Sequence, residues 1–130
     1  MAPAGAPADA ETVAAITATV RESIACRNAN DLASAYTLFT QEMLVALFGG
    51  PATVDPEASA TRVEDVAPLS RRQRVAVVAL TGVVMLPDGR AGAIVETMTA
   101  EHTFRDYLFF ARDAESGRWL IDEVEELPAP

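Results

Sequence analysis

Two long apolar runs separated by a short turn are the clearest feature of the hydropathy pattern. They lie within residues 74–100, where mostly apolar, often β-branched residues are interrupted by Leu86-Pro87-Asp88-Gly89-Arg90. The proline and the aspartate suit the central positions of a type I turn, and the glycine can adopt the left-handed conformation that follows. This pattern predicts a β-hairpin with a three-residue loop and with Leu86 opposite Arg90.

Upstream of the hairpin, the apolar residues follow helical spacing. They recur every three or four positions over residues 11–27, which predicts an amphipathic helix with Asp9 as its N-cap. Shorter helices are predicted over residues 32–39 and 41–48, and a fourth over residues 56–65, where Pro56 follows a capping aspartate.

Two further strands are predicted downstream, over residues 103–112 and 118–125, joined by a polar loop that ends in Gly117. Helices followed by an antiparallel meander predict an α+β fold, with the N-terminal helices packed on one face of a curved antiparallel sheet. We expect one domain over residues 11–127. A disordered lead-in rich in Pro and Ala would precede it over residues 1–10, and a short tail would follow over residues 128–130.

The turn also predicts which hairpin residues share a face of the sheet. With Leu86 opposite Arg90, Leu80 faces Glu96, and one face carries the larger apolar side chains. These are Val78, Leu80, Val84, Leu86, Ile94 and Met98. The other face carries Val75, Val77, Val83, Met85 and Val95. A sheet face in water should carry charged residues, so we expect helices on the first face and predict a homodimer through the second, open face.

Composition narrows the range of partners. The 130 residues carry a net charge of −9, which argues against nucleic acid and against an anionic membrane surface as partners. No segment approaches the ~18 apolar residues of a membrane-spanning helix. Cys26 is the only cysteine, so an intramolecular disulfide and a cysteine-based metal site are excluded, and we expect no cofactor and no metal. We expect a cytoplasmic protein or, alternatively, the mature part of an exported one.

Several short segments together resemble a known superfamily. They are Ala29-Asn30-Asp31-Leu32, Tyr36-Thr37-Leu38-Phe39-Thr40, Pro87-Asp88-Gly89-Arg90 and Gly117-Arg118-Trp119-Leu120-Ile121-Asp122. Their order resembles the nuclear transport factor 2-like superfamily, which includes ketosteroid isomerases and polyketide-cyclase-like proteins. The resemblance implies a cone-shaped, cystatin-like α+β fold, a pocket between helices and sheet, and frequent homodimers. The tyrosine and the two acids that ketosteroid isomerases use in catalysis do not align residue by residue with this chain.

Two acids interrupt apolar strand faces. Glu96 lies between Ile94 and Met98 on the face assigned to the helices, where a carboxylic acid kept protonated can take part in proton transfer. Asp106 interrupts the apolar face of the next strand, and two acids on one face would form an acid/base pair. The alternative for each is an acid that reaches solvent or pairs with an arginine.

Two aromatic residues and one histidine complete the candidates. Tyr36 either directs its hydroxyl into the pocket or fills the core with the hydroxyl satisfied at the edge. Trp119 is expected to be a structural core residue. His102 is the only histidine and has no partners at metal-ligand spacing, so it indicates neither a metal site nor a catalytic site.

Two functions remain open from the sequence. The first is a non-catalytic domain that binds a small apolar molecule, or a partner, in a pocket between helices and sheet. The expected lining is Tyr36, Leu80, Ile94, Glu96, Met98 and Asp106. The second is a cofactor-free isomerase, dehydratase or cyclase in which Glu96 or Asp106 acts together with Tyr36. We favour the binding domain because the strands carry few polar residues.

Overall fold

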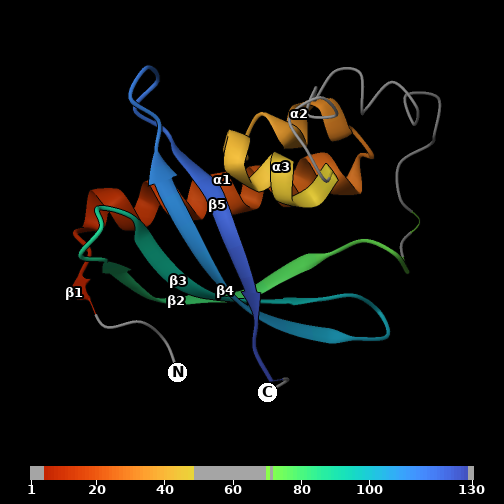
Figure 1. Ribbon diagram of the computed structural model, residues 1–130. Helices are drawn as coiled ribbons and strands as arrows, with labels where there is room; N and C mark the ends of the chain where they lie inside the picture. Colours follow the sequence, from red (N-terminus) through yellow and green to blue (C-terminus); the bar gives the residue numbers. More distant parts are fainter. Residues whose placement is uncertain (1–4, 49–69, 71, 129–130) are drawn as a thin grey trace.

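The computed structural model describes residues 5–48, 70 and 72–128, and this part of the chain has an α+β fold with N-terminal helices and an antiparallel sheet, as predicted (Figure 1). The described helices are α1 (Ala10–Asn28), α2 (Leu32–Tyr36) and α3 (Gln41–Phe48). The described strands are β1 (Ala6–Pro7), β2 (Ala76–Met85), β3 (Ala91–Met98), β4 (Thr103–Arg112) and β5 (Trp119–Glu126). The helix predicted over residues 56–65 lies outside the described residues.

Each described helix begins beside a capping side chain. The Asp9 carboxylate accepts a hydrogen bond from the backbone N–H three residues ahead at 2.7 Å, and Asp31 accepts the corresponding bond at 3.2 Å. The Thr40 hydroxyl oxygen does the same at the start of α3, at 3.2 Å. These bonds satisfy N–H groups that have no partner inside the helix, so the three side chains determine where the helices begin.

The described strands form one sheet in the order β1-β2-β3-β4-β5. β1 pairs with the end of β2 at one edge of the sheet. β1 itself lies within residues 1–10, the segment predicted as a disordered lead-in. A parallel bridge between Phe39 and Ile121 joins the helical layer to β5. The Ile121 N–H donates to the Leu38 carbonyl at 2.8 Å, and the Ile121 carbonyl accepts from the Thr40 N–H at 2.9 Å. The chain between α2 and α3 is therefore held directly on the sheet.

The turn of the β2–β3 hairpin is the one predicted from the sequence. The Leu86 N–H donates to the Arg90 carbonyl at 2.8 Å, and Gly89 has a φ of 90°. Next to the turn the predicted register is also confirmed, because Val84 faces Gly92.

Two β-bulges in β2 change the register farther from the turn. The first lies between Thr81 and Val84 and contains Gly82, whose φ of 63° costs glycine no steric strain. The second lies between Val77 and Ala79. Each bulge shifts the pairing by one residue and moves the side chains that follow to the other face.

The predicted pairing of Leu80 with Glu96 is therefore wrong. Leu80 faces Val95, and Glu96 faces Ala79. Leu80 packs against the core that the helices cover, and Val95 belongs to that core. Because side chains alternate along β3, Glu96 points away from the helices.

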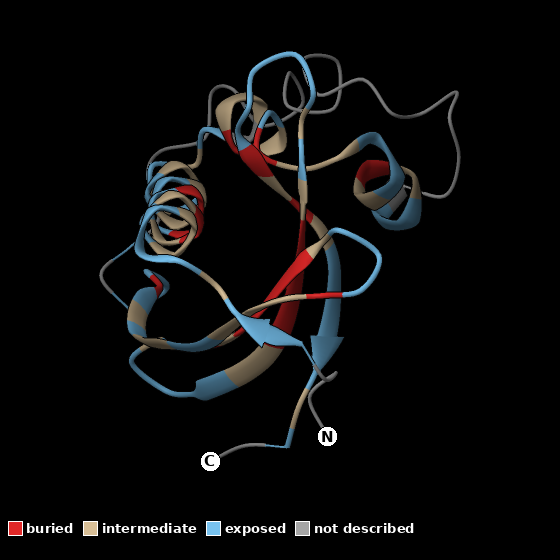
Figure 2. Cartoon of the chain, turned by 90° about the vertical axis from the view of Figure 1, so that its left-hand side faces the viewer, coloured by how far each residue is buried: buried red, intermediate tan, exposed pale blue. Residues whose placement is uncertain are grey.

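The helices cover the face that was predicted to be open. The main core joins α1 to this face, and its buried members are Ile16, Val20, Ala91, Ala93, Val95, Leu108, Phe110, Trp119 and Ile121. The set predicted for the open face contributes to it: Val95 is a member, and Val77, Val83 and Met85 pack against it. The face assignment is therefore wrong, and the apolar patch that motivated the homodimer is covered by the chain's own helices. The prediction gave the helices the larger side chains, whereas the core that α1 joins contains the small residues Ala91 and Ala93. Figure 2 shows the buried residues of the long helix on its sheet-facing side.

The opposite face, called the outer face below, carries a smaller apolar cluster. Its buried members are Leu86, Tyr107 and Phe109, with Val84, Ile94 and Leu127 packed against them. The Arg90 guanidinium lies 4.7 Å from the centre of the Phe109 ring and pairs with Asp122 at 3.1 Å and Glu123 at 3.2 Å. Side chains of the same chain therefore cover the aromatic residues of this face.

Candidate functional site

A cavity of about 420 Å³ lies between the three described helices and strands β4 and β5, and we call it the helix–sheet pocket. Its lining is Ser23, Ile24, Arg27, Ala35, Tyr36, Phe39, Met43, Leu47, Leu108, Ile121 and Val124. Figure 1 shows α2 and α3 gathered near the C-terminal end of α1, which is where these side chains meet.

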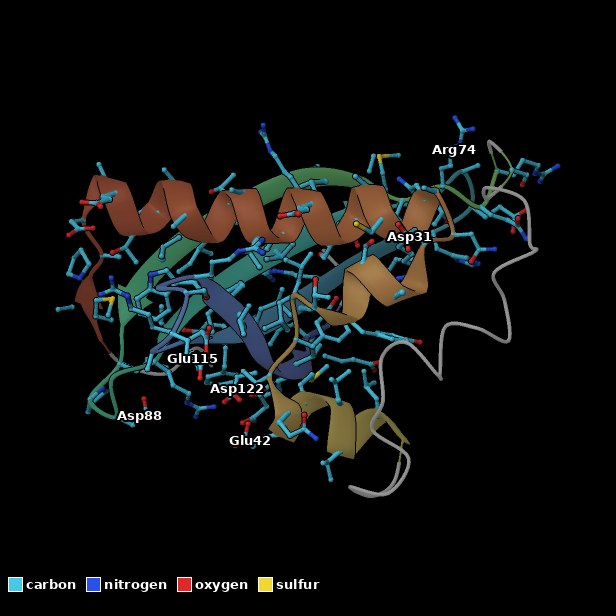
Figure 3. All side chains as sticks on the ribbon, turned by 90° about the horizontal axis from the view of Figure 1, so that it is seen from above. Asp31, Glu42, Arg74, Asp88, Glu115 and Asp122 are labelled. Carbon is cyan, nitrogen blue, oxygen red and sulfur yellow. The ribbon has the colours of Figure 1, made fainter. Side chains whose placement is uncertain are left out.

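The local sequence explains how the helical wall of the pocket forms. Asn30 ends α1 in a left-handed conformation with a φ of 60°, which reverses the chain into α2. The Thr40 hydroxyl then donates a hydrogen bond to the Asp122 carboxylate at 2.7 Å, which holds the start of α3 against β5. Figure 3 shows Asp122 on β5 near the beginning of α3, with Glu42 next to it on the helix. The two short helices thus face β4 and β5 across the pocket.

The described lining of this pocket is mainly apolar. The Ser23 hydroxyl donates to the Val20 carbonyl within α1, at 2.8 Å, so it is already engaged. The Tyr36 ring is half-buried and lies 6.1 Å from the Phe39 ring, centre to centre. Arg27 is exposed at the end of α1 and is the one charged group among the described lining residues. No Asp, Glu or His belongs to that described lining, which offers apolar contacts, one cation and the Tyr36 phenol.

The residues predicted to line a pocket are divided between the two faces of the sheet. Tyr36 does line the helix–sheet pocket. Leu80 packs against the main core instead. Ile94, Glu96 and Met98 lie on the outer face, because side chains alternate along β3 and Ala93 and Val95 belong to the main core on the helix-covered face.

On the outer face these residues have ordinary structural environments. Ile94 packs against the cluster of Tyr107 and Phe109. Met98 is 44% exposed. The Glu96 carboxylate is 3.7 Å from the Arg105 guanidinium, so the sequence-based alternative, an acid paired with an arginine, describes it correctly. Glu96 therefore takes no part in the pocket.

Asp106 lies on the helix-covered face but outside the helix–sheet pocket. It is half-buried on β4, two residues from Leu108, and faces Glu126 on β5. It lines a separate hollow of about 230 Å³ together with Thr103 and Phe104. Burial and the neighbouring Glu126 carboxylate raise the pKa of Asp106 above its usual value. Asp106 and Glu96 do not form the predicted acid/base pair, because they lie on opposite faces.

Other chemically active side chains do not form a second site in the described part of the chain. His102 is exposed, with its ring 6.0 Å from that of Phe104. Burial, together with Asp31 and Glu22, raises the pKa of the Cys26 thiol, which disfavours the reactive thiolate. Within residues 5–48 and 70–128, apart from residue 71, His, Cys, Asp and Glu form no group of three that could hold a metal ion.

Sequence reasoning missed most of the pocket lining, although part of the signal was present. Met43 and Leu47 are four residues apart on α3 and so share one side of that helix. Ile24 ends the apolar stripe predicted for α1, and Arg27 follows one turn later on the same side. An exposed arginine at a helix end is usually a solvated residue, so the pattern gave no reason to select it.

No protein-family model, curated protein or solved structure matches this chain. Among the described helices, none is both long and apolar enough to cross a membrane.

Proposed function

We propose that this chain is a non-catalytic domain that binds a small, mainly apolar molecule in the helix–sheet pocket. The observation that carries the proposal is the described lining: predominantly apolar side chains, with Ser23, Arg27 and Tyr36 as the polar contributors. The volume of about 420 Å³ falls in the lower part of the ~300–1,000 Å³ range of small-molecule sites, so a compact or singly tailed ligand would fit.

Membership of the nuclear transport factor 2-like superfamily is part of this proposal. Three features support it: helices precede an antiparallel sheet, they cover one of its faces, and a pocket lies between the two layers. Folds of this kind serve both binding proteins and enzymes, so the choice between them depends on the lining of the pocket.

An alternative proposal is a cofactor-free isomerase, dehydratase or cyclase. The observation in its favour is Asp106, whose pKa is raised by burial and by Glu126 on the face that the helices cover. We favour binding because Asp106 lines the neighbouring hollow and not the pocket. A ligand that the wild type binds and releases unchanged supports the binding function, whereas turnover that Asp106→Asn abolishes supports the alternative.

A pair of tryptophan substitutions tests the binding function. Val124 is 42% exposed on β5 and lines the pocket, whereas Val78 is 52% exposed on β2 and does not. In a calorimetric titration with decan-1-ol, an uncharged probe, we expect Val124→Trp to fill the pocket and weaken binding about tenfold or more. The matched control, Val78→Trp, should bind like the wild type. Equal affinities in the two variants, or no binding by the wild type, would contradict the proposal.

A further inference from the structure

The one cation in the described lining of the helix–sheet pocket is poorly neutralised. Arg27 lies in the last turn of α1, and its side chain is exposed at the edge of the pocket. Within the described residues, no carboxylate lies within 4.0 Å of its guanidinium. Arg90, Arg105 and Arg118 each pair with at least one acid. Arg21 and Arg112 also have no described carboxylate within 4.0 Å, but neither lines the pocket, so its place in the lining is what distinguishes Arg27.

This exposure of a positive charge is notable in an acidic chain. The net charge is −9, so carboxylates outnumber the arginines that could pair with them. Ser23, Ile24 and Arg27 form the α1 wall of the pocket within a single turn, which places the guanidinium beside apolar side chains. An apolar cavity with a single cation at its edge is complementary to a molecule with an apolar body and one anionic end.

We propose that the ligand of this pocket is an amphiphile with an anionic oxygen group, such as a carboxylate, which Arg27 binds. This inference rests on the proposed binding function and adds the chemical class of the ligand. The planar guanidinium can donate two parallel hydrogen bonds to a carboxylate. The apolar body would then contact Ile24, Met43, Leu108 and Val124, which line the cavity.

Two other roles are consistent with parts of the same geometry. An arginine in the last turn stabilises a helix through its dipole, but that role does not distinguish one ligand head group from another. The facing acids Asp106 and Glu126 would favour a cationic head group, but they line the neighbouring hollow rather than the pocket. The choice among these roles can be tested by varying only the head group of the ligand.

The experiment compares decanoate, decan-1-ol and decylammonium, which share one alkyl chain, in calorimetric titrations at neutral pH. Because the guanidinium is exposed, we expect decanoate to bind about fivefold more tightly than decan-1-ol. The readout is the ratio of the decanoate and decan-1-ol affinities within each variant: Arg27→Gln should bring this ratio to about one, and Arg27→Lys should retain part of the preference. Arg21→Gln is the matched control: Arg21 is also exposed on α1 but does not line the pocket, so the preference should persist.

The outcomes separate this inference from the binding function. If decan-1-ol binds in the pocket and decanoate binds no better, the inference is wrong and the binding function stands. Tighter binding of decylammonium, or equal effects of Arg27→Gln and Arg21→Gln, also overturns the inference. If none of the three probes binds, both proposals fail. Denaturation midpoints exclude unfolding as the cause: Arg27→Gln should be less stable than Arg21→Gln by no more than the ~1 kcal/mol that a charge in the last helical turn contributes, and Arg27→Lys should keep that contribution.

Discussion

Gly92 is the position where a single added methyl group should be most costly. It lies on β3 beneath the Tyr107 ring of β4, and both belong to the outer face. A β-carbon at Gly92 would overlap the Tyr107 hydroxyl oxygen and would lie 2.7 Å from both Cε1 and Cζ of the ring. Tyr107 is 1% exposed and packs with Leu86 and Phe109, so the ring cannot turn away without opening that cluster.

We therefore expect Gly92→Ala to destabilise the fold by about 1–3 kcal/mol, the usual cost of overpacking a well-filled site. The measurement is the free energy of unfolding from urea denaturation, with the slope of the transition checked against the wild type. Gly82→Ala is an informative comparison, because no atom lies within 4 Å of the added methyl group there. Its expected cost of about 1–2 kcal/mol comes from the left-handed backbone alone.

A second, independent test of the packing around Gly92 uses the Tyr107 hydroxyl. This hydroxyl is buried and has no hydrogen-bond partner among the described residues. Removing an unpaired buried hydroxyl recovers a desolvation cost of about 1–3 kcal/mol, so Tyr107→Phe should leave the stability unchanged or raise it. Gly92→Ala should also cost less in the Tyr107→Phe background, because the nearest overlapping atom is gone. A Gly92→Ala variant within ~0.5 kcal/mol of the wild type would refute this account of the outer face.

Three further predictions concern the core, one acid and the assembly. Trp119 is 8% exposed in the main core, so Trp119→Ala should cost about 3–5 kcal/mol; an unchanged denaturation midpoint would contradict the position of β5. The raised pKa of Asp106 means that its contribution to stability is fully present below the unfolded pKa and is lost as pH rises through the folded pKa. Asp106→Asn should therefore be at least as stable as the wild type at neutral pH. Asp113→Asn should be less stable there, because it removes a carboxylate whose pKa is lowered by hydrogen bonds from Ser116. The opposite order of stabilities would contradict the pKa directions given for Asp106 and Asp113. The homodimer remains a prediction, although the apolar patch from which it was argued is covered by the helices. Light scattering should give twice the monomer mass of 13.8 kDa, and a mass of 13.8 kDa at micromolar concentration would contradict the dimer.

The elements that could be predicted from the sequence are those determined by local chemistry. The caps Asp9, Asp31 and Thr40 satisfy backbone groups a few residues away, and the helices that they begin lie close to the predicted ranges. The turn at Gly89 likewise depends on four or five neighbouring residues. The predicted register is correct only next to the turn, as far as the pair of Val84 and Gly92.

Which side chains lie on which face of the sheet could not be predicted, because that depends on β-bulges and helix packing outside the turn. Gly82 is an isolated glycine within an apolar strand, which is a recognised signal for a bulge. A bulge placed at Gly82 predicts the first register shift correctly. The second bulge, at Val78, lies among β-branched and small residues that give no such signal. Which face meets α1 is decided by tertiary packing, in which Ile16 and Val20 of α1 join one core with residues from several strands of the sheet.

The candidate site was predicted only in part for the same reason. Tyr36 was expected to line a pocket from the second helix, and it does. Arg27 was overlooked because exposure at a helix end is normal for an arginine, and only the packing of α2 and α3 shows that a cavity lies beside it. Glu96 was selected because the face that it shares with Ile94 and Met98 was assigned to the helices, and that assignment is wrong.

The most direct test of ligand binding in the helix–sheet pocket is a methyl NMR titration with decan-1-ol. Methyl groups of Ile24, Leu108 and Val124 report on the pocket, whereas those of Leu86 and Ile94 report on the outer face. We predict saturable shifts at the first three residues, with little change at the other two. Shifts confined to the outer face, or no saturable shift at any pocket methyl group, would contradict the proposed function.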